Sequence, residues 1–253
     1  MDRGIYTAAS GGLVSTRSLD VIANNLANVN TVGFKAERVV SRQQTFEDTL
    51  ASTLANAPAR AAADADVAPG VVDIATKTDF TMGPVAATGN PLDAALTKPN
   101  QFFVVQTEDG EAYTRAGNFQ LNSTGILVTA DGLPVLGDGG QLVAPPNGTP
   151  SLTSSGDIIV NKESIGKLRV VEVANLDDLQ RKDGVRFVPK AGAGQASIVE
   201  ASIVPGAVEM PNVNAVSSMV DMINAQRSFE AYTKLAKELS ELDDLSIRNA
   251  GRG

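Results

Sequence analysis

The two ends of the chain carry the same helical repeat, which constrains the fold more than any other feature of the sequence. Near the start, apolar and small residues step by three and four through Ile5, Ala8, Gly12, Ser15, Leu19, Ile22, Leu26 and Val29. Near the end, the same steps recur through Ala215, Ser218, Met222, Ala225, Phe229, Tyr232, Ala236 and Leu239. Such a seam is the a/d pattern of a coiled coil. We therefore expect two long helices that pair with each other.

Local signals set the expected ends of these helices. Gly33 suits a helix stop, because glycine adopts left-handed backbone angles at low steric cost. Asn212 or Asn214 suits the N-cap of the second helix, which would be roughly 50 Å long at 1.5 Å per residue. The sequence thus predicts an N-terminal coiled-coil helix over residues 1–35 and a C-terminal one over residues 209–250.

The middle of the chain indicates a β-rich domain over residues 79–208. Two apolar strands flank the Asp109-Gly110 turn in QFFVVQTEDGEAYTRAGNFQL, and later strands are expected in KLRVVEVANL and GVRFVPK. Further turns are expected at Ser123–Gly125, Asp131-Gly132 and Gly137–Gly140. The predicted fold class is α+β, in which long N- and C-terminal helices pair as a coiled coil around an inserted β-rich domain.

Residues 36–78 are expected to form a linker or extended region. Its alanine-rich part, Ala51–Ala68, has little apolar content apart from alanine. Such a stretch is compatible with a linker, with a segment that becomes ordered on assembly, and with a helix. All three alternatives stay open at this point.

Composition argues against several classes of function. The net charge is −8 and the pI about 4.6, so the surface repels phosphate backbones and we expect no nucleic-acid partner. The chain has no cysteine and no histidine, which removes thiolate chemistry and the most common general base. This composition weighs heavily against a hydrolase, and no residue pattern leads us to expect a metal or a cofactor. The N-terminal segment has neither the apolar core of a signal peptide nor a run of membrane-spanning length, so export would need a pathway without a cleaved signal.

Two glycine-rich motifs lack the residues that known ligand-binding loops require. DGLPVLGDGG lacks the alternating aspartates and the closing glutamate of an EF-hand calcium loop, so simple turns are expected there. GAGQAS lacks the third glycine of a dinucleotide loop and follows no strand-helix unit. Neither motif predicts a binding site.

Long motifs at both ends resemble the axial proteins of the bacterial flagellum, which form the rod, the hook and the hook-filament junction. SLDVIANNLANVNTVGFKAERV resembles their N-terminal signature, and MPNVNAVSSMVDMINAQRSFEAYTKLAKEL their C-terminal one. AYTRAGNFQLNSTGILVTADGLPVLGDGG resembles the β domain shared by rod and hook proteins. The opening is most similar to proximal rod, or F-type, members, with the distal rod protein as the alternative. One departure is Pro99-Asn100-Gln101, where the family often has Gly-Asp-Gly before the two phenylalanines.

The resemblance implies a structural subunit of the flagellar basal-body rod and no enzymatic activity. Such proteins are exported by the flagellar type III export apparatus without a cleaved signal peptide. They polymerise helically, with copies of themselves and with other rod proteins, into the drive shaft that crosses the periplasm. A secreted β-domain protein that binds polysaccharide is the rival class, but it would not explain the two helical ends.

The resemblance also predicts which residues form subunit interfaces. These are the seam and motif residues Ile5, Leu19, Ile22, Asn24, Asn25, Leu26, Asn28, Val29, Asn30, Gly33, Phe34, Asn212, Asn214, Met222, Gln226, Arg227, Phe229, Tyr232 and Leu239. The asparagine amides either satisfy the helix end or bond neighbouring subunits, and the resemblance favours the second role. Gln226 and Arg227 belong either to a solvated face or to an inter-subunit contact. Apolar residues off the seam, namely Val14, Val21, Val220 and Ile223, should be exposed in a single chain.

Overall fold

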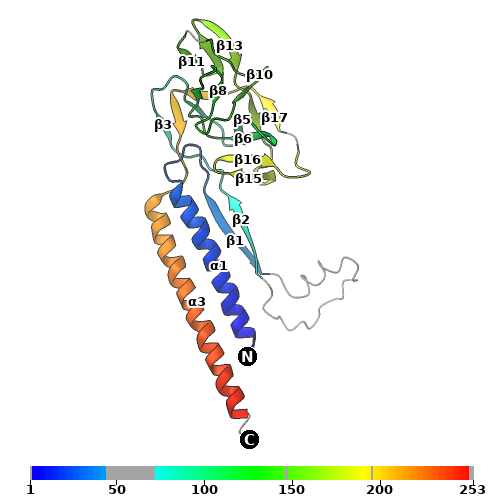
Figure 1. Cartoon of the computed structure of the whole chain (residues 1–253), viewed down its shortest axis with the longest axis vertical. Coiled ribbons are helices and arrows are strands. Elements are labelled where there is room, and N and C mark those ends of the chain that lie inside the picture. Colours follow the sequence, from blue (N-terminus) through cyan, green and yellow to red (C-terminus); the bar gives the residue numbers. More distant parts are fainter. Residues whose placement is uncertain (1, 44–71, 146–147, 195, 251–253) are drawn as a thin grey trace. The chain divides into compact units, whose positions relative to one another are not determined.

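The computed structural model describes residues 2–43, 72–145, 148–194 and 196–250, which fall into two compact units. Unit 1 contains the two long helices and one pair of strands (Figure 1). Unit 2 is formed by residues 27–36 and 78–214 and contains the other strands. The fold is α+β, as predicted, with a helix at each end and a β-rich middle. None of the described helices is both long and apolar enough to cross a membrane.

The N-terminal helix, α1, spans Asp2–Ala27 and is shorter than the sequence predicts. The chain turns directly after it, where the backbone N–H of Thr31 donates to the carbonyl of Asn28 at 3.0 Å. The Thr31 hydroxyl also donates to the Asn28 side chain at 3.1 Å. These local bonds offer the backbone an alternative to the helix. The prediction that Gly33 ends the helix is therefore wrong, because Gly33 lies beyond this turn.

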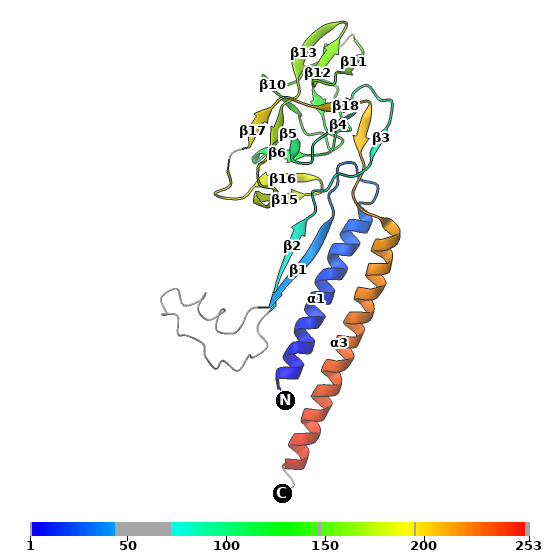
Figure 2. The ribbon, with the colours of Figure 1, turned by 180° about the vertical axis from the view of Figure 1, so that it is seen from behind.

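The C-terminal helix, α3, spans Ala215–Ala250, and its 36 residues give a length of about 54 Å at 1.5 Å per residue. Asn214 occupies the position directly before the helix, which is the N-cap position. Within unit 1, α1 and α3 run side by side in opposite directions (Figures 1 and 2). A Cβ added at Gly11 would lie 2.5 Å from the Tyr232 ring, and one at Gly4 would lie 3.1 Å from Leu239. Glycines at these two positions of α1 thus leave room for the large side chains of Tyr232 and Leu239 on α3.

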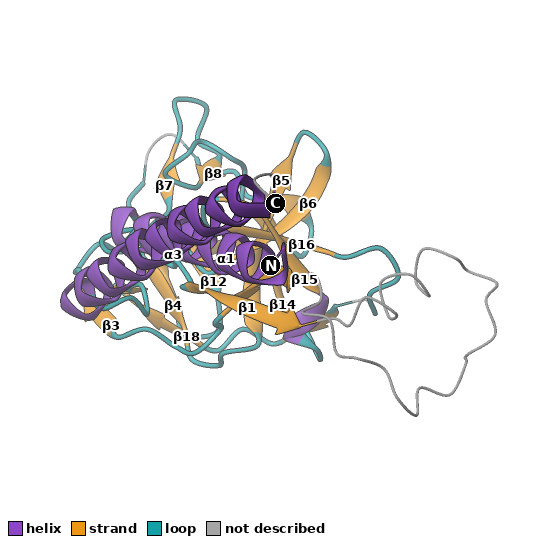
Figure 3. Cartoon of the chain, turned by 90° about the horizontal axis from the view of Figure 1, so that it is seen from below, coloured by secondary structure: helices purple, strands orange, loops and turns teal. Residues whose placement is uncertain are grey.

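A pair of strands completes unit 1. β1 (Glu37–Gln43) and β2 (Val72–Thr78) form a two-stranded sheet, so the predicted linker contains regular structure at both of its ends. The alanine-rich segment Ala51–Ala68 lies outside the described residues. In Figure 3, β1 is drawn in orange and the two long helices in purple.

The end of α1 is tied to β1 by the side chain of Asn25. Its amide donates to the Glu37 carbonyl at 2.7 Å and accepts from the Glu37 N–H at 2.9 Å. Val21 lies one turn earlier on the same helical face and is only 5% exposed. The expectation that Val21 is exposed in a single chain is wrong, because Val21 shares its helical face with Asn25, which bonds to the start of β1.

Unit 2 is built on a six-stranded antiparallel sheet with the strand order β15-β16-β6-β5-β14-β17. Its strands are β5 (Gln101–Thr107), β6 (Gly110–Thr114), β14 (Val170–Glu172), β15 (Leu179–Asp183), β16 (Arg186–Pro189) and β17 (Ser197–Val199). The predicted β5–β6 hairpin is confirmed, with Thr107 opposite Gly110 at its turn. The strands expected in KLRVVEVANL and GVRFVPK are present as well.

Shorter strands extend unit 2 around this sheet. Two-stranded sheets pair β3 (Val85–Ala87) with β19 (Ala207–Glu209), β4 (Ala94–Leu96) with β18 (Ile203–Pro205), β7 (Gln120–Leu121) with β8 (Leu127–Val128), and β9 (Leu136–Gly137) with β10 (Gly140–Gln141). A three-stranded sheet joins β11 (Pro150–Leu152), β12 (Asp157–Val160) and β13 (Glu163–Lys167). One short 3-10 helix, η1, spans Leu176–Asp178. The predicted turns are confirmed at Gly125, Gly132 and Gly140, each of which has a positive φ.

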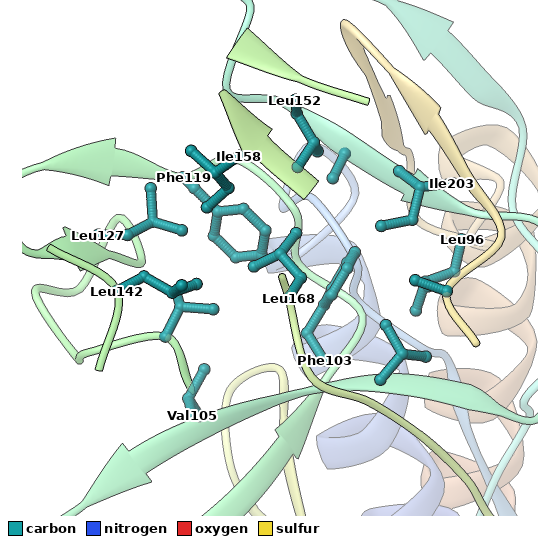
Figure 4. Packing of buried hydrophobic residues seen from close by; sticks show 14 of the residues in the cluster. Leu96, Phe103, Val105, Phe119, Leu127, Leu142, Leu152, Ile158, Leu168 and Ile203 are labelled. Atoms are coloured by element: carbon teal, nitrogen blue, oxygen red, sulfur yellow. The ribbon is translucent and has the colours of Figure 1, made fainter. Parts of the chain in front are cut away.

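The central strand β5 is buried on both faces, and its side chains belong to two apolar clusters. Phe103 and Val105 enter the larger cluster, together with Phe119 and Leu168 (Figure 4). The alternate residues Phe102 and Val104 enter the second cluster, which also contains Phe80 and Phe187. Side chains of a strand alternate between its faces, and a run of large apolar residues therefore specifies a strand covered on both sides.

Candidate functional site

Three chain segments and one arginine meet in unit 2 around the buried carboxylate of Glu209. We call this group the junction; it comprises residues 33–36, 79–83 and 209–212 together with Arg115. One carboxylate oxygen, Oε1, accepts from Lys35 Nζ at 2.7 Å and from the Gly83 N–H at 3.0 Å. The other, Oε2, accepts from Arg115 Nε at 2.7 Å and lies 2.5 Å from Arg115 Nη2. All three charged side chains are about 1% exposed.

The two cations of the junction also bind backbone carbonyls. Lys35 Nζ donates to Thr81 O at 2.6 Å, and Arg115 Nη1 donates to Lys98 O at 2.5 Å and to Gln101 O at 2.7 Å. Burial lowers the pKa of Lys35, while the charge of Glu209 and the hydrogen bond to it oppose that shift. Two positive charges thus share one carboxylate, and the carbonyl dipoles supply the rest of their solvation.

The backbone of the junction passes so close to its neighbours at residue 33 that only glycine fits there. Gly33 has φ +71°, and its N–H donates to Glu209 O at 2.8 Å. A Cβ at this position would lie 2.3 Å from the backbone nitrogen of Ala116. Gly33 therefore serves this close approach, and not the end of a helix.

Aromatic packing fixes the neighbouring side of the junction. Phe34 is 1% exposed, and the Arg181 guanidinium lies 4.7 Å from its ring centroid and 5.2 Å from that of Phe187. Arg181 also donates to the carbonyl of Lys35. Stacking of a guanidinium on rings in this distance range is favourable. Phe34 therefore anchors the segment that follows α1 within unit 2.

The side chain of Asn212 joins the remaining segments. Its Oδ1 accepts from the Ala36 N–H at 2.7 Å. Its Nδ2 donates to Asp79 O at 2.9 Å and to Thr81 O at 3.2 Å. The N–H of Asp79 in turn donates to Ala36 O at 2.8 Å. Asn212 thus joins the segments of Ala36 and Asp79 within unit 2, and Asn214 occupies the N-cap position of α3.

The junction lies within unit 2 and contains residues next to the connections to β1, β2 and α3. Ala36 directly precedes β1, Asp79 directly follows β2, and Asn212 stands shortly before α3. The junction therefore holds, within unit 2, the points at which the chain leaves for β1, returns from β2 and leaves for α3. Its charged groups are buried and bonded to one another, an arrangement that fixes geometry and offers a substrate no access.

Other features of the described residues give no stronger chemical site. No group of three or more His, Cys, Asp or Glu within the described ranges could hold a metal ion. An open hollow of about 80 Å³ in unit 2 is lined by Thr31, Val32, Thr114, Ala116, Asn118, Thr129, Ala130, Asp131, Val185 and Arg186. Arg186 in this lining is held by Asp183 at 2.5 Å and by Asp131 at 3.3 Å.

A second notable surface lies on α3. Val216 is 72% exposed, and Met219, Val220 and Ile223 are each 52% exposed. We call these four residues the outward stripe. Their i, i+3, i+4 and i+7 spacing places them on one helical face. Further along α3 this face becomes charged, with Arg227, Glu230 and Lys234 all exposed. The apolar part of the face is therefore confined to the first turns of the helix.

The structure places the predicted interface residues in several environments. On α1, Ile5, Leu19, Ile22 and Leu26 are half-buried, Asn24 is exposed and Asn25 is buried. After α1, Asn28 and Val29 are half-buried, Asn30 is exposed, and Gly33 and Phe34 are buried in unit 2. Before and on α3, Asn212, Met222 and Leu239 are half-buried, and Asn214, Gln226, Arg227, Phe229 and Tyr232 are exposed.

Several of the predicted interface residues make contacts within the single chain. Asn25, Gly33 and Phe34 make contacts inside the chain, and their role at subunit interfaces stays a prediction. Gln226 donates to Glu230 at 3.3 Å along the helix surface. Arg227 forms no ion pair with any side chain that the structure describes.

Sequence reasoning missed the three charged residues of the junction. Lys35 stands inside the N-terminal motif, in VGFKAE, Glu209 directly precedes the C-terminal motif, in AVEMPN, and Arg115 lies in AYTRAG. Each resembles an ordinary surface charge, because burial of an ion depends on partners that are remote in sequence. The only signal of their burial in the sequence was a single charge within a stretch of otherwise apolar or small residues.

Comparisons with known proteins agree with the motifs at both ends. Family models match residues 5–35 (Flagella basal body rod protein), 98–167 (Flagellar hook protein FlgE/F/G D1 domain) and 204–249 (Flagellar basal body rod FlgEFG protein C-terminal). The flagellar basal-body rod protein FlgF of Caulobacter vibrioides is 32% identical, and the alignment covers 100% of this chain and 99% of the relative. FlgF of Escherichia coli is 33% identical over 100% and 97%. FlgG of Bacillus subtilis is 34% identical over 96% and 97%.

Proposed function

Because the chain belongs to the flagellar basal-body rod protein family, in which it is F-like, we propose that it polymerises helically through its terminal helices to form part of the flagellar drive shaft. It is a structural subunit of the basal-body rod. The proximal rod is the proposed location, and the distal rod is the alternative, since relatives named FlgG also align over most of the chain.

The observation that carries polymerisation is the outward stripe of α3. Its four side chains are half exposed or more in the single chain. Covering them would contribute on the order of 3–6 kcal/mol per subunit, taking about half of the ~1.5–3 kcal/mol that full burial of each such side chain is worth. A contiguous exposed apolar patch of this kind marks an interaction surface. A neighbouring subunit is the proposed partner.

Coiled-coil pairing of α1 with α3 is part of the proposal. On α3, the seam positions Ala215, Ser218, Met222, Ala225, Ala236 and Leu239 are half-buried, whereas the stripe is exposed. Phe229 and Tyr232 continue the seam at 39% and 37% exposure. One face of α3 is thus turned toward α1, and the other remains for a neighbour.

The remaining interface residues and partners follow from the same proposal. Asn24, Asn28 and Asn30 are assigned to contacts with neighbouring subunits, along with Gln226 and Arg227. The partners are copies of the chain, other rod proteins and the flagellar type III export apparatus, and no nucleic acid or cofactor is involved. The protein acts as a structural element without enzymatic activity, in a rod that crosses the periplasm, and is exported without a cleaved signal peptide.

The test places charges in the outward stripe. Val220→Asp combined with Ile223→Asp should abolish fibre formation at high protein concentration, as measured by sedimentation and electron microscopy, because two carboxylates cannot be buried without partners. The matched control, Asn224→Asp combined with Ser228→Asp, adds the same charge to exposed positions of α3 outside the stripe. Circular dichroism should show the same helix content in both variants. Fibres from the stripe variant equal to those of the control would refute the proposal.

A further inference from the structure

Two segments of the junction run alongside each other in the same direction. Gly33 N–H donates to Glu209 O at 2.8 Å, and three residues later Ala36 N–H donates to the Asn212 side chain at 2.7 Å. Between these two bonds, Lys35 forms its ion pair with Glu209 at 2.7 Å. The residues are therefore paired in register, 33 with 209 and 36 with 212, so the two segments are parallel.

We propose that the junction is a mechanical clamp that carries tension between the two terminal helices past the β domain. The chain enters segment 33–36 from α1 and leaves segment 209–212 toward α3. A pull on the two helices therefore reaches these two segments before it reaches any strand between them. While the clamp holds, tension crosses from one segment to the other, and the strands of residues 37–208 are not stretched.

The parallel arrangement determines how the clamp is loaded. A pull through α1 acts on the N-terminal end of segment 33–36, and a pull through α3 acts on the C-terminal end of segment 209–212. For parallel segments, this slides one along the other, so that every cross-link is strained at once. Pulling on the same end of both segments would instead peel the cross-links apart one after another.

The chemistry of the junction suits this role. Lys35, Arg115 and Glu209 are about 1% exposed, so water has little access to the ion pairs during a short pull. Arg115 also ties Glu209 to the strands, since it donates to the carbonyl of Gln101 at the start of β5. Opening the clamp thus requires separation of buried opposite charges. The close approach of Gly33 and the stacking of Arg181 on Phe34 hold the same segment from its other sides.

The clamp is a property of the single chain and does not require the polymer. Its benefit in a rotating shaft rests on the proposed function, because terminal helices held by neighbours would be pulled while the shaft bears torque. A single-molecule measurement separates the two proposals: failure of fibre formation leaves the clamp intact, and failure of the clamp leaves polymerisation intact.

The experiment stretches the full chain between two attachment points in a force spectrometer. With handles at both chain ends, we expect one rupture event after the helices have separated. The roughly 170 residues released between the two clamped segments would extend by up to about 600 Å at ~3.5 Å per residue. For comparison, one handle is moved to Ser41→Cys, at an exposed position in β1, while the other stays at the C-terminal end. The chain has no native cysteine, so this attachment is unique.

The first comparison is between the two pulling geometries, with wild-type residues at the clamp in both. Handles at the two chain ends load the clamp in shear, whereas a handle at position 41 loads both segments from their C-terminal ends and peels them. We expect a higher rupture force in shear. Equal forces in the two geometries, or gradual extension without a single large step, would overturn the proposal.

A variant of Glu209 tests the chemistry of the clamp. Glu209→Gln should make rupture at a given force about a hundredfold faster or more, the fold-change that corresponds to about 3 kcal/mol at 1.4 kcal/mol per factor of ten. The matched control is Glu200→Gln, which alters a glutamate whose side chain is 90% exposed. Rupture of the Glu209 variant at the rate of the control would contradict the proposal. The comparison of pulling geometries needs no substitution at the clamp and stands even where Glu209→Gln fails to fold.

Discussion

Removing the single carboxylate of the junction should cost more than removing one of its two cations. Glu209→Gln leaves Lys35 and Arg115 buried without a counter-charge, and breaking a buried ion pair in this way costs about 3–5 kcal/mol. Lys35→Met instead leaves the pair of Arg115 with Glu209 intact. The Thr81 carbonyl that Lys35 bonded keeps a donor in Asn212, at 3.2 Å. We therefore expect this variant to cost at most about 1–2 kcal/mol.

The double variant makes this reasoning quantitative. With Lys35→Met and Glu209→Gln together, only Arg115 is left without an anion. The combined loss should therefore be smaller than the sum of the single losses by at least about 1 kcal/mol, within the ~0.5–3 kcal/mol range of residues in direct contact. Native-state hydrogen exchange at the β5 and β6 amides measures the stability of unit 2 separately from the helices. Losses that add to within about 0.5 kcal/mol, or Lys35→Met as costly as Glu209→Gln, would refute the reasoning.

Three further predictions concern the helices and the pH dependence. Gly12→Ala should stabilise α1 by up to about 1 kcal/mol, because an added methyl meets nothing within 4 Å. Gly11→Ala should stabilise the helix less, because its methyl would meet the Tyr232 ring of α3. Thermal melts followed by circular dichroism compare the two variants, and equal gains in stability would contradict the packing of α1 on α3. Asn25→Ala should cost about 1–3 kcal/mol in urea unfolding, because it strips a backbone N–H and C=O of their buried partner, and exposed Asn30→Ala should cost almost nothing. Burial lowers the pKa of Lys35 below its ordinary value of 10.5, so the unfolded chain binds that proton more tightly than the folded chain does. The stability of the wild type relative to Lys35→Met should therefore increase as the pH rises toward 10.5. A difference between their urea midpoints that does not change with pH would contradict this prediction.

The sequence predicted those parts of the fold that are encoded by local spacing. The hairpin of β5 and β6 follows from two apolar runs around Asp109-Gly110, and the turns at Gly125, Gly132 and Gly140 follow from glycine's tolerance of positive φ. The two terminal helices follow from steps of three and four. In each case, the signal and its structure lie within about one turn or hairpin of each other.

Pairings between remote segments could not be read in the same way. β4 pairs with β18 and β3 pairs with β19, yet nothing in the short sequences of these strands identifies the partner. The end of α1 was misplaced for a related reason. Gly33 carries the local signal of a helix stop, but the backbone that leaves no room for a Cβ there belongs to Arg115 and Ala116, which are remote in sequence.

The candidate site was the part least accessible to prediction. Lys35 and Glu209 are 174 residues apart, and a pattern method assigns isolated charges to the surface. Asn25 shows the same limitation in a short loop, since its amide is buried against the Glu37 backbone only because the chain returns there. The quoted motifs contain Lys35, Arg115 and Asn212, but neither Glu209 nor residues 79–83, which join them only through contacts in the folded chain.

The bond between Ala36 and Asp79 has a consequence for how this chain can vary in length. The two residues mark the start and the return of the excursion that contains β1 and β2, and the Asp79 N–H donates directly to the Ala36 carbonyl. The ends of the excursion are therefore fixed by contacts within unit 2, independently of how many residues separate them. Extra residues inserted between β1 and β2 should thus be tolerated by unit 2, which makes this excursion a natural place for related chains to acquire additional surface modules.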